Sequence, residues 1–138
     1  MSELNRFGVS IENNLLSKFD RLISERGYVN RSEALRDLIR KELVQQQISE
    51  NKGEAVGTVT IVFNHHESEV TEQLTSVQHD FMKQIISSTH VHLDHHNCLE
   101  VIIVKGAAIE IRKIADRLIS LKGVKHGNLS LTTTGKIE

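Results

Sequence analysis

The sequence has little of three features that would assign it to other classes of protein. It contains one cysteine, Cys98, so no disulfide can form within the chain, and a free thiol is compatible with a reducing compartment. Its longest aliphatic run, residues 101–104, is far too short to span a membrane, and the N-terminus lacks the basic and apolar regions of a signal peptide. The formal net charge of −1 provides no general attraction to polyanions. We therefore expect a cytoplasmic globular protein without a membrane segment.

Histidine is missing from the first 64 residues, and all eight histidines lie between His65 and His126. Side chains suited to metal chemistry are thus confined to the C-terminal part. From Gln45 the sequence loses its apolar period, and it then reaches a breaker at Gly53. We expect an N-terminal domain over residues 1–48, a linker at 49–54 and a C-terminal domain over 55–138.

Two amphipathic helices are predicted in the N-terminal part. Apolar residues recur at helical spacing from Ile11 to Ile23, and Gly27 can adopt the left-handed conformation that ends this helix. Asn30 is a suitable N-cap for a second helix, with Glu33 three positions later as in a capping box.

Residues 4–11 alternate between apolar and other residues, which predicts one strand. A lone strand leaves both edges unpaired, so we expect it to pair with a second copy about a two-fold axis. The exposed face of that antiparallel ribbon would carry Arg6, Gly8 and Ser10. A two-stranded ribbon fits the major groove of DNA, where Arg can bond guanine and a hydroxyl can contact base edges. Gly8 has no side chain to contribute.

The order of strand, helix, Gly-containing turn and helix resembles the ribbon-helix-helix repressors over roughly residues 1–45. Positions 30–37 carry the resemblance to the family's turn and second-helix start, with the sequence Asn-Arg-Ser-Glu-Ala-Leu-Arg-Asp. The resemblance implies that Asn30 and Arg31 lie where the second helix holds a DNA phosphate.

Two further residues of this segment, Glu33 and Asp37, lie one helical turn apart and resemble carboxylates that hold a cation near DNA in some relatives. The alternative is a solvated or Arg-paired face. For Arg6 and Arg31 the alternative is that they are ordinary solvated charges.

The C-terminal part predicts six elements in the order βαββαβ, a ferredoxin-like unit with both helices on one face of the sheet. The expected elements are a strand at residues 59–63, a helix at 70–81, strands at 90–93 and 98–104, a helix that ends at Gly123, and a strand at 129–134. The fold class of the whole chain is therefore α+β.

A metal site is predicted in the hairpin of this unit. His90 and His92 are two residues apart on a strand, so their rings project from the same face. Cys98 joins that face if the loop holds an odd number of residues and lies on the opposite face if the number is even. Two imidazoles and a thiolate suit a transition metal. The alternative is a buried Cys98 that acts as a small hydrophobe beside exposed strand histidines.

His79 lies opposite the apolar stripe of the helix at residues 70–81, so it should point away from its own sheet. If it binds metal, its simplest partner is the hairpin of another subunit; otherwise it is an ordinary surface histidine. The remaining histidines are candidates for auxiliary metal sites or exposed positions, namely His65, His66, His95, His96 and His126.

The pattern of His79, His90-Val91-His92 and Cys98-Leu99-Glu100 resembles the nickel-responsive regulators, which join a ribbon-helix-helix domain to a ferredoxin-like domain of the ACT type. The resemblance spans nearly the whole chain. It implies one square-planar Ni(II) per chain, held by His90, His92 and Cys98 of one subunit and His79 of a neighbour. It also implies a homotetramer, a dimer of dimers, that represses nickel uptake genes from a palindromic DNA operator and is not an enzyme.

Other functions remain open on the sequence alone. One alternative is an antitoxin-type regulator, in which the C-terminal part binds a protein partner and the histidines are incidental. Another is a regulator that senses a different transition metal. A metalloenzyme would need an open coordination position and a general base, and no such base is evident. An ACT-type domain that binds an amino acid would not need the His and Cys residues.

Overall fold

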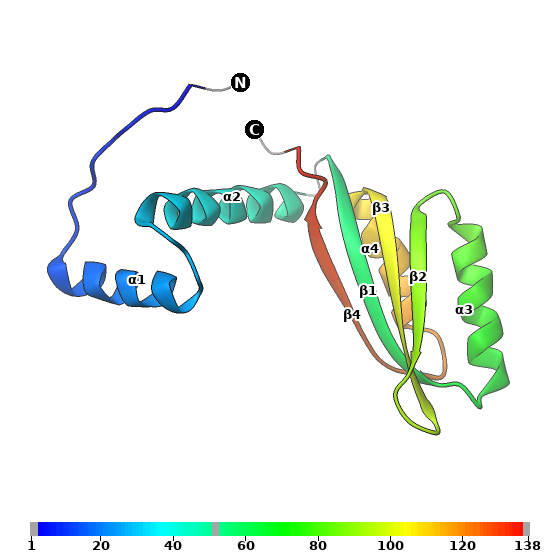
Figure 1. The fold of residues 1–138 in the computed structure, drawn as a ribbon. Coiled ribbons are helices and arrows are strands. Elements are labelled where there is room, and N and C mark those ends of the chain that lie inside the picture. The colour runs from blue at the N-terminus through cyan, green and yellow to red at the C-terminus, as the bar shows by residue number, and fades with distance from the viewer. Residues whose placement is uncertain (1–2, 51–52, 137–138) are drawn as a thin grey trace. The chain divides into compact units, whose positions relative to one another are not determined.

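The computed structural model describes residues 3–50 and 53–136, and the chain divides into two compact units, residues 1–41 and 42–138. Figure 1 shows the helices and strands of both units. None of the helices within the described ranges has the length and apolar character needed to cross a membrane.

The first unit contains helix α1, Asn13–Glu25, and the start of helix α2, Arg31–Ser49. Gly27 follows the C-cap of α1 with a φ of 85°, a conformation in which other residues are strained. The side chain of Asn30 accepts a hydrogen bond of 2.8 Å from the backbone N–H of Glu33, which caps α2. Both helix ends predicted from the sequence are confirmed.

The strand predicted for residues 4–11 is not formed within the single chain. Residues 3–12 run as an extended segment without strand hydrogen bonds, and their side chains are exposed, with Phe7 at 72% and Val9 at 65%. A strand requires a neighbouring strand to pair with, and the described part of this unit contains none.

Helix α2 continues to Ser49, beyond the end of its apolar pattern. The helix thus extends beyond Gln45, where the apolar period is lost, since Gln and Glu favour a helix even without an apolar stripe. Residues 51–52 of the predicted linker lie outside the described part of the chain. The exact bounds of the two domains stay a prediction.

The second unit has the predicted order βαββαβ. Its elements are β1, Glu54–Asn64; α3, Ser68–Asp80; β2, Ile85–His92; β3, Asn97–Ala107; α4, Ala108–Ile119; and β4, Val124–Thr133. The four strands form one sheet in the order β2-β3-β1-β4, and every neighbouring pair is antiparallel. Each helix thus joins strands that are separated by one other strand, and the ferredoxin-like fold class is confirmed.

The core lies between one face of this sheet and the helices α3 and α4 (Figure 1). Alternate residues of β1 and β3 are buried on that face, including Val59, Phe63 and Ile102. They pack against the apolar stripes of the two helices, represented by Leu74 and Ile114. Burial of alternate strand positions is what a sheet with one covered face requires.

Several element bounds differ from the sequence prediction, and the largest differences are at the starts of β1, β2 and β4 and at the end of α4. β2 begins at Ile85 and β4 at Val124, earlier than the apolar pattern indicates, because polar residues there pair through their backbones. α4 ends at Ile119 rather than at Gly123, which lies in the following connection with a φ of 102°.

The close approach of α4 to β4 leads to a prediction about Gly127. A Cβ atom at this position would lie 2.6 Å from Cγ1 and 2.9 Å from Cγ2 of Ile119. We expect Gly127→Ala to lower the free energy of unfolding by about 1–3 kcal/mol, because a packed core must shift to admit the methyl group. Urea unfolding followed by circular dichroism would measure the loss. Asn128→Ala, at an exposed neighbouring position, is the control, and equal midpoints for the two variants would contradict the packing argument.

Candidate functional site

The pairing of β2 with β3 places His92 directly opposite Cys98 and His90 directly opposite Glu100. Directly opposed residues of an antiparallel pair point to the same face of the sheet. The loop between His92 and Cys98 therefore holds an odd number of residues, and Cys98 shares a face with both His90 and His92. This is the face that α3 and α4 cover, because Cys98 and Glu100 are both buried there.

Three potential metal ligands converge at the end of the sheet. The Sγ atom of Cys98 lies 3.0 Å from Nδ1 of His65 and 3.3 Å from Nδ1 of His92. The ligand atoms of all three residues lie within 4.8 Å of one another. One ion can therefore reach all three after small side-chain movements, since metal–nitrogen and metal–sulfur bonds are about 2.0–2.3 Å long.

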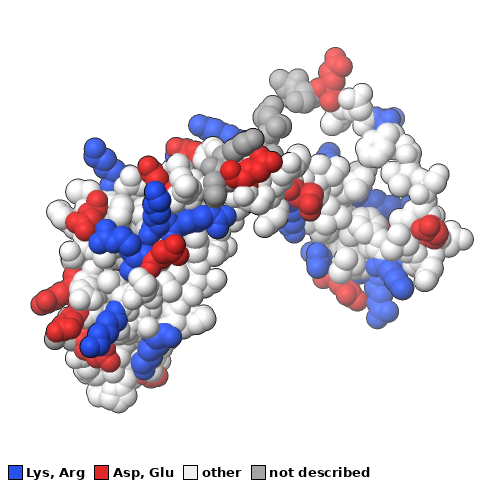
Figure 2. All heavy atoms as spheres, turned by 180° about the vertical axis from the view of Figure 1, so that it is seen from behind, with Lys and Arg blue, Asp and Glu red and all other residues white. Residues whose placement is uncertain are grey.

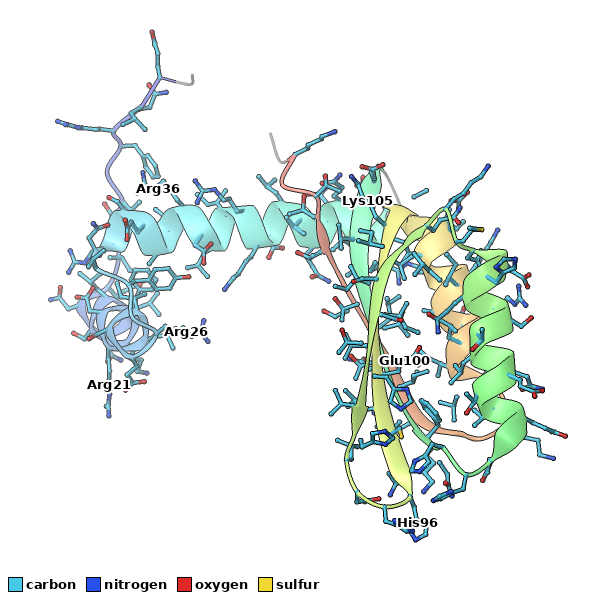
Figure 3. The ribbon with its side chains drawn as sticks, turned by 45° about the vertical axis from the view of Figure 1, so that its right-hand side comes forward. Arg21, Arg26, Arg36, His96, Glu100 and Lys105 are labelled. Carbon is cyan, nitrogen blue, oxygen red and sulfur yellow. The ribbon has the colours of Figure 1, made fainter. Side chains whose placement is uncertain are left out.

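His90 lies beside this cluster, with its ring centroid 5.2 Å from that of His92. Its Nδ1 atom is 3.7 Å from a carboxylate oxygen of Glu100, and its ring meets Phe63 edge to face at 5.7 Å. The other carboxylate oxygen of Glu100 accepts a hydrogen bond of 2.5 Å from the Gln78 side chain of α3. Figure 3 shows Glu100 on the side of the sheet toward α3.

His79 lies outside the cluster. It is exposed on α3, whereas Val70, Leu74 and Val77 of the same helix are buried against the sheet. This is the orientation that the helical periodicity predicts. The structure of one chain thus does not bring His79 to the other three predicted ligands.

The environment of the thiol disfavours its charged form. Burial raises the pKa of Cys98, and the negative charge of Asp94 raises it further. Asp94 itself has its pKa lowered to about 2, chiefly because the backbone N–H of Asn97 donates a hydrogen bond to it. Burial and the neighbouring histidines lower the pKa of His65. A neutral imidazole can ligate a metal directly, but the thiol must first lose its proton.

Sequence reasoning assigned His65 only to a possible auxiliary site. The signal that identifies it is topological. In the order β2-β3-β1, the end of β1 lies beside the start of β3, where Phe63 pairs with Cys98 and Asn64 with Asn97. The residue that follows β1 therefore lies next to the thiol.

The other histidines lie outside this donor cluster. His66, His95 and His96 are exposed, and Figure 3 shows His96 at the end of the β2–β3 hairpin. His126 is exposed on β4, opposite Val62 of β1.

In the first unit, the residues predicted to read DNA bases are accessible. Arg6, Gly8 and Ser10 are all exposed on the extended segment before α1. The side chain of Arg31 makes two hydrogen bonds of 2.8 Å to Asp20 of α1, and this ion pair lowers the pKa of Asp20. At the start of α2 the Arg31 guanidinium is thus held by a carboxylate rather than free.

The two carboxylates predicted to hold a cation line an open hollow with Tyr28, Arg36 and Arg40. Glu33 is exposed, and Asp37 accepts a hydrogen bond from the Tyr28 hydroxyl. That bond is the main cause of the lowered pKa of Asp37.

The surface charge does not by itself identify a DNA-binding face. On the face shown in Figure 2, Lys and Arg side chains are interspersed with Asp and Glu. This face therefore carries no broad patch of a single charge that would by itself attract a polyanion.

Comparison with family models assigns a class to each part of the chain. Residues 5–46 match the model of ribbon-helix-helix proteins of the copG family, and residues 56–132 match the model described as the NikR C terminal nickel binding domain. A DNA-binding domain joined to a nickel-binding domain defines a transcriptional regulator, not an enzyme, with DNA as a partner and Ni(II) as the bound ion.

Several relatives align with almost the whole chain under the name "Putative nickel-responsive regulator". One from Pyrococcus furiosus is 59% identical over 131 residues, which is 95% of each chain. One from Thermococcus onnurineus is 58% identical over 97% of each chain, and one from Geobacter metallireducens is 56% identical over 99% of this chain and 98% of its own length. The chain belongs to the nickel-responsive regulator family.

A solved structure of an uncharacterized protein from Thermotoga maritima is similar in fold alone. It aligns with a TM-score of 0.52 at 15% sequence identity, over 57% of this chain and 98% of that chain.

The two histidines next to the Cys98–His92 pair lead to a prediction about metal preference. His65 completes a three-donor cluster within one chain, whereas His90 belongs to the set expected for nickel. Zn(II) prefers tetrahedral nitrogen and sulfur donors, so we expect His65→Gln to lower Zn(II) affinity at least about tenfold and to leave Ni(II) affinity nearly unchanged. His90→Gln should show the opposite preference. Competition titrations with a chromophoric chelator would measure both, and an equal loss of both ions in both variants would contradict the assignment.

Proposed function

We propose that this chain is a nickel-responsive repressor in which His90, His92 and Cys98 of one subunit and His79 of a neighbouring subunit hold one Ni(II) per chain. The observation that carries the proposal is the hairpin register, in which His90 and His92 share a face with Cys98. His79 is exposed on α3, away from its own sheet, so the set of four donors needs a second chain.

The donors fit the ion. Ni(II) takes imidazole and thiolate ligands, and a planar set of three nitrogens and one sulfur distinguishes it from Zn(II), which prefers a tetrahedron. Cys98 is buried, and its thiol must lose a proton to bind the ion, so nickel binding releases that proton to solvent and becomes tighter as pH rises. When bound, the ion supplies a crosslink between the hairpin of one subunit and α3 of another.

A buried carboxylate connects the hairpin to α3 within one chain. Glu100 accepts a hydrogen bond from Gln78 and lies 3.7 Å from the ring of His90. Gln78 directly precedes His79 in α3. The orientation of the His90 ring and the position of α3 are therefore coupled through one carboxylate, and we propose that this contact orders α3 when His90 becomes a ligand.

The first unit supports a dimer as the DNA-binding form. In the described part of this unit only Ile23 and Ala34 are buried apolar residues, while apolar side chains of α1 and α2 such as Leu15 and Ile39 remain exposed. An apolar hollow lined in part by Phe7 and Phe19 faces solvent. We propose that a second copy covers these surfaces and that residues 4–11 then pair as an antiparallel ribbon.

The ribbon would present Arg6 and Ser10 to base edges of a palindromic operator, and the N-terminus of α2 at Asn30 and Arg31 would bind a phosphate. Because Asp20 already holds Arg31, phosphate binding by that guanidinium must displace or share the carboxylate. Glu33 and Asp37 are proposed as an auxiliary cation site, with Tyr28 as a neighbour.

We further propose a homotetramer, a dimer of dimers, located in the cytoplasm and controlling nickel uptake genes. Ligation of His79 across subunits then restricts the orientations in which the DNA-binding dimers can meet the operator. A typical coupling free energy of about 1–3 kcal/mol would raise operator affinity about 5- to 150-fold, and DNA would raise metal affinity by the same factor.

The thiol provides the direct test of this function. Titration of apo-protein with Ni(II) should produce a thiolate-to-nickel charge-transfer band that saturates at one equivalent per chain. DNA selected from genomic fragments by the nickel-loaded protein should then bind more weakly without nickel. We expect Cys98→Ala to lose both the band and the nickel dependence and to retain its circular dichroism, while His126→Gln keeps both. A normal nickel response in Cys98→Ala would overturn the site assignment.

Base recognition by the N-terminal segment gives a separate prediction. Arg6→Ala should weaken binding to the selected DNA by about 1–3 kcal/mol, because one bidentate contact to a base is lost. Its nickel titration should be unchanged. The control is Arg21→Ala, which removes an exposed guanidinium paired with Glu25 of α1. Fluorescence anisotropy at fixed salt would measure both variants, and an equal effect of the two would mean that Arg6 contributes charge only.

A further inference from the structure

The last turn of α3 carries the proposed interchain ligand, His79, and it is anchored on both sides of that residue. On one side, Gln78 donates a hydrogen bond to the buried carboxylate of β3. On the other side, Asp80 and Phe81 both contact the guanidinium of Arg117 in α4. The nickel centre proposed above uses the first anchor and assigns no role to the second.

Arg117 contacts the end of α3 in two ways. Its Nη2 atom lies 3.5 Å from Oδ2 of Asp80, the last residue of the helix, and its Cζ atom lies over the Phe81 ring, 5.1 Å from the centroid. The two helices lie in contact on the covered face of the sheet (Figure 1). One guanidinium thus meets a carboxylate and an aromatic face on neighbouring residues, for which its planar, delocalised charge is well suited.

The position of this cation at a helix C-terminus strengthens the contact. The carbonyl groups of a last helical turn carry a partial negative charge, which a nearby Arg side chain stabilises. The turn is closed by hydrogen bonds from the backbone N–H of Phe81 to Val77 at 3.2 Å and from that of Met82 to His79 at 3.3 Å. Because the Arg117 side chain is half exposed, its two contacts should each favour the closed turn by only about two- to fivefold, and together by about tenfold.

Phe81 connects this contact to the rest of the fold. Its ring is partly buried against the core, and its carbonyl oxygen accepts hydrogen bonds from the backbone N–H groups of Gln84 at 2.9 Å and Ile85 at 3.2 Å, where β2 begins. Arg117 directly precedes Leu118, which is buried in the same core. The end of α3 is therefore fixed to a part of the fold that contains none of the proposed metal ligands.

We propose that Arg117 is a positioning residue for the nickel ligand His79, an inference that rests on the function proposed above. The guanidinium holds the last turn of α3 closed in the metal-free chain, because neither of its contacts involves a donor of the nickel centre. The direction in which the His79 side chain leaves the helix is thereby set before the ion binds. A ligand that is already positioned loses less entropy on binding, so its bond to the ion breaks more slowly.

The test measures nickel release from the full-length protein to a chromophoric chelator. Arg117→Ala should release Ni(II) about three- to tenfold faster, while the thiolate-to-nickel charge-transfer band still saturates at one equivalent per chain. Arg117→Lys should recover part of the loss, since an ammonium group can also pair with Asp80 and lie over the Phe81 ring. The control is Lys113→Ala, which removes another exposed cation of α4 and should release nickel as the wild type does.

A double-mutant cycle separates positioning from a general structural role. In a His79→Ala background, Arg117→Ala should cause no further change in nickel release, because no ligand remains to be positioned. Hydrogen exchange of the metal-free proteins provides a second readout. In Arg117→Ala the amides of Phe81 and Met82 should exchange faster, while exchange in the strands stays unchanged.

The outcomes distinguish this inference from the nickel centre on which it rests. Wild-type nickel release in Arg117→Ala, equal effects of that substitution with and without His79, or unchanged exchange at the Phe81 and Met82 amides would each overturn the positioning role and leave the centre in place. If His79→Ala instead releases nickel as the wild type does, the shared centre itself is refuted, and the positioning role is refuted with it.

Discussion

Strand β3 is hydrogen-bonded on both sides, and its residue Cys98 pairs with Phe63 of β1 on one side and with His92 of β2 on the other. This double pairing places the thiol at the centre of the sheet end, where the turn after β1 adds His65. A slip of one residue in either pairing would turn the Cys98 side chain to the opposite face relative to its partners. The metal donors therefore depend on the strand register, which the core on the covered face holds in place.

The covered face also contains a carboxylate that packing alone would not favour. Glu100 is buried on this face, and a buried polar group is costly unless it is hydrogen-bonded. Its partners are Gln78 of α3 and His90 of β2, one on the helix that carries His79 and one on the hairpin. The carboxylate thus contacts both elements that supply the proposed ligands, which is the basis of the coupling proposed above.

In each unit the single chain leaves exposed a group that the proposed assembly would engage. The first unit leaves apolar side chains of α1 and α2 exposed, and its described residues contain no strand that could pair with the extended segment. The second unit exposes His79 on the outer side of α3. In the assembly proposed above, the hydrophobic effect would bury the apolar faces, and metal ligation would engage His79. The family to which the chain belongs is that of the nickel-responsive regulators.

The residue pattern by itself determined the order of the elements and the covered face of the sheet. It also determined the end of α1 at Gly27 and the start of α2 at Asn30. These features depend on local conformation and on burial along one element. Helix and strand lengths were predicted less well where polar residues continue an element, as in α2. Only the tertiary structure decided that Cys98 shares a face with His92 and that His65 reaches its sulfur, since strand register and strand order join residues that no local pattern connects.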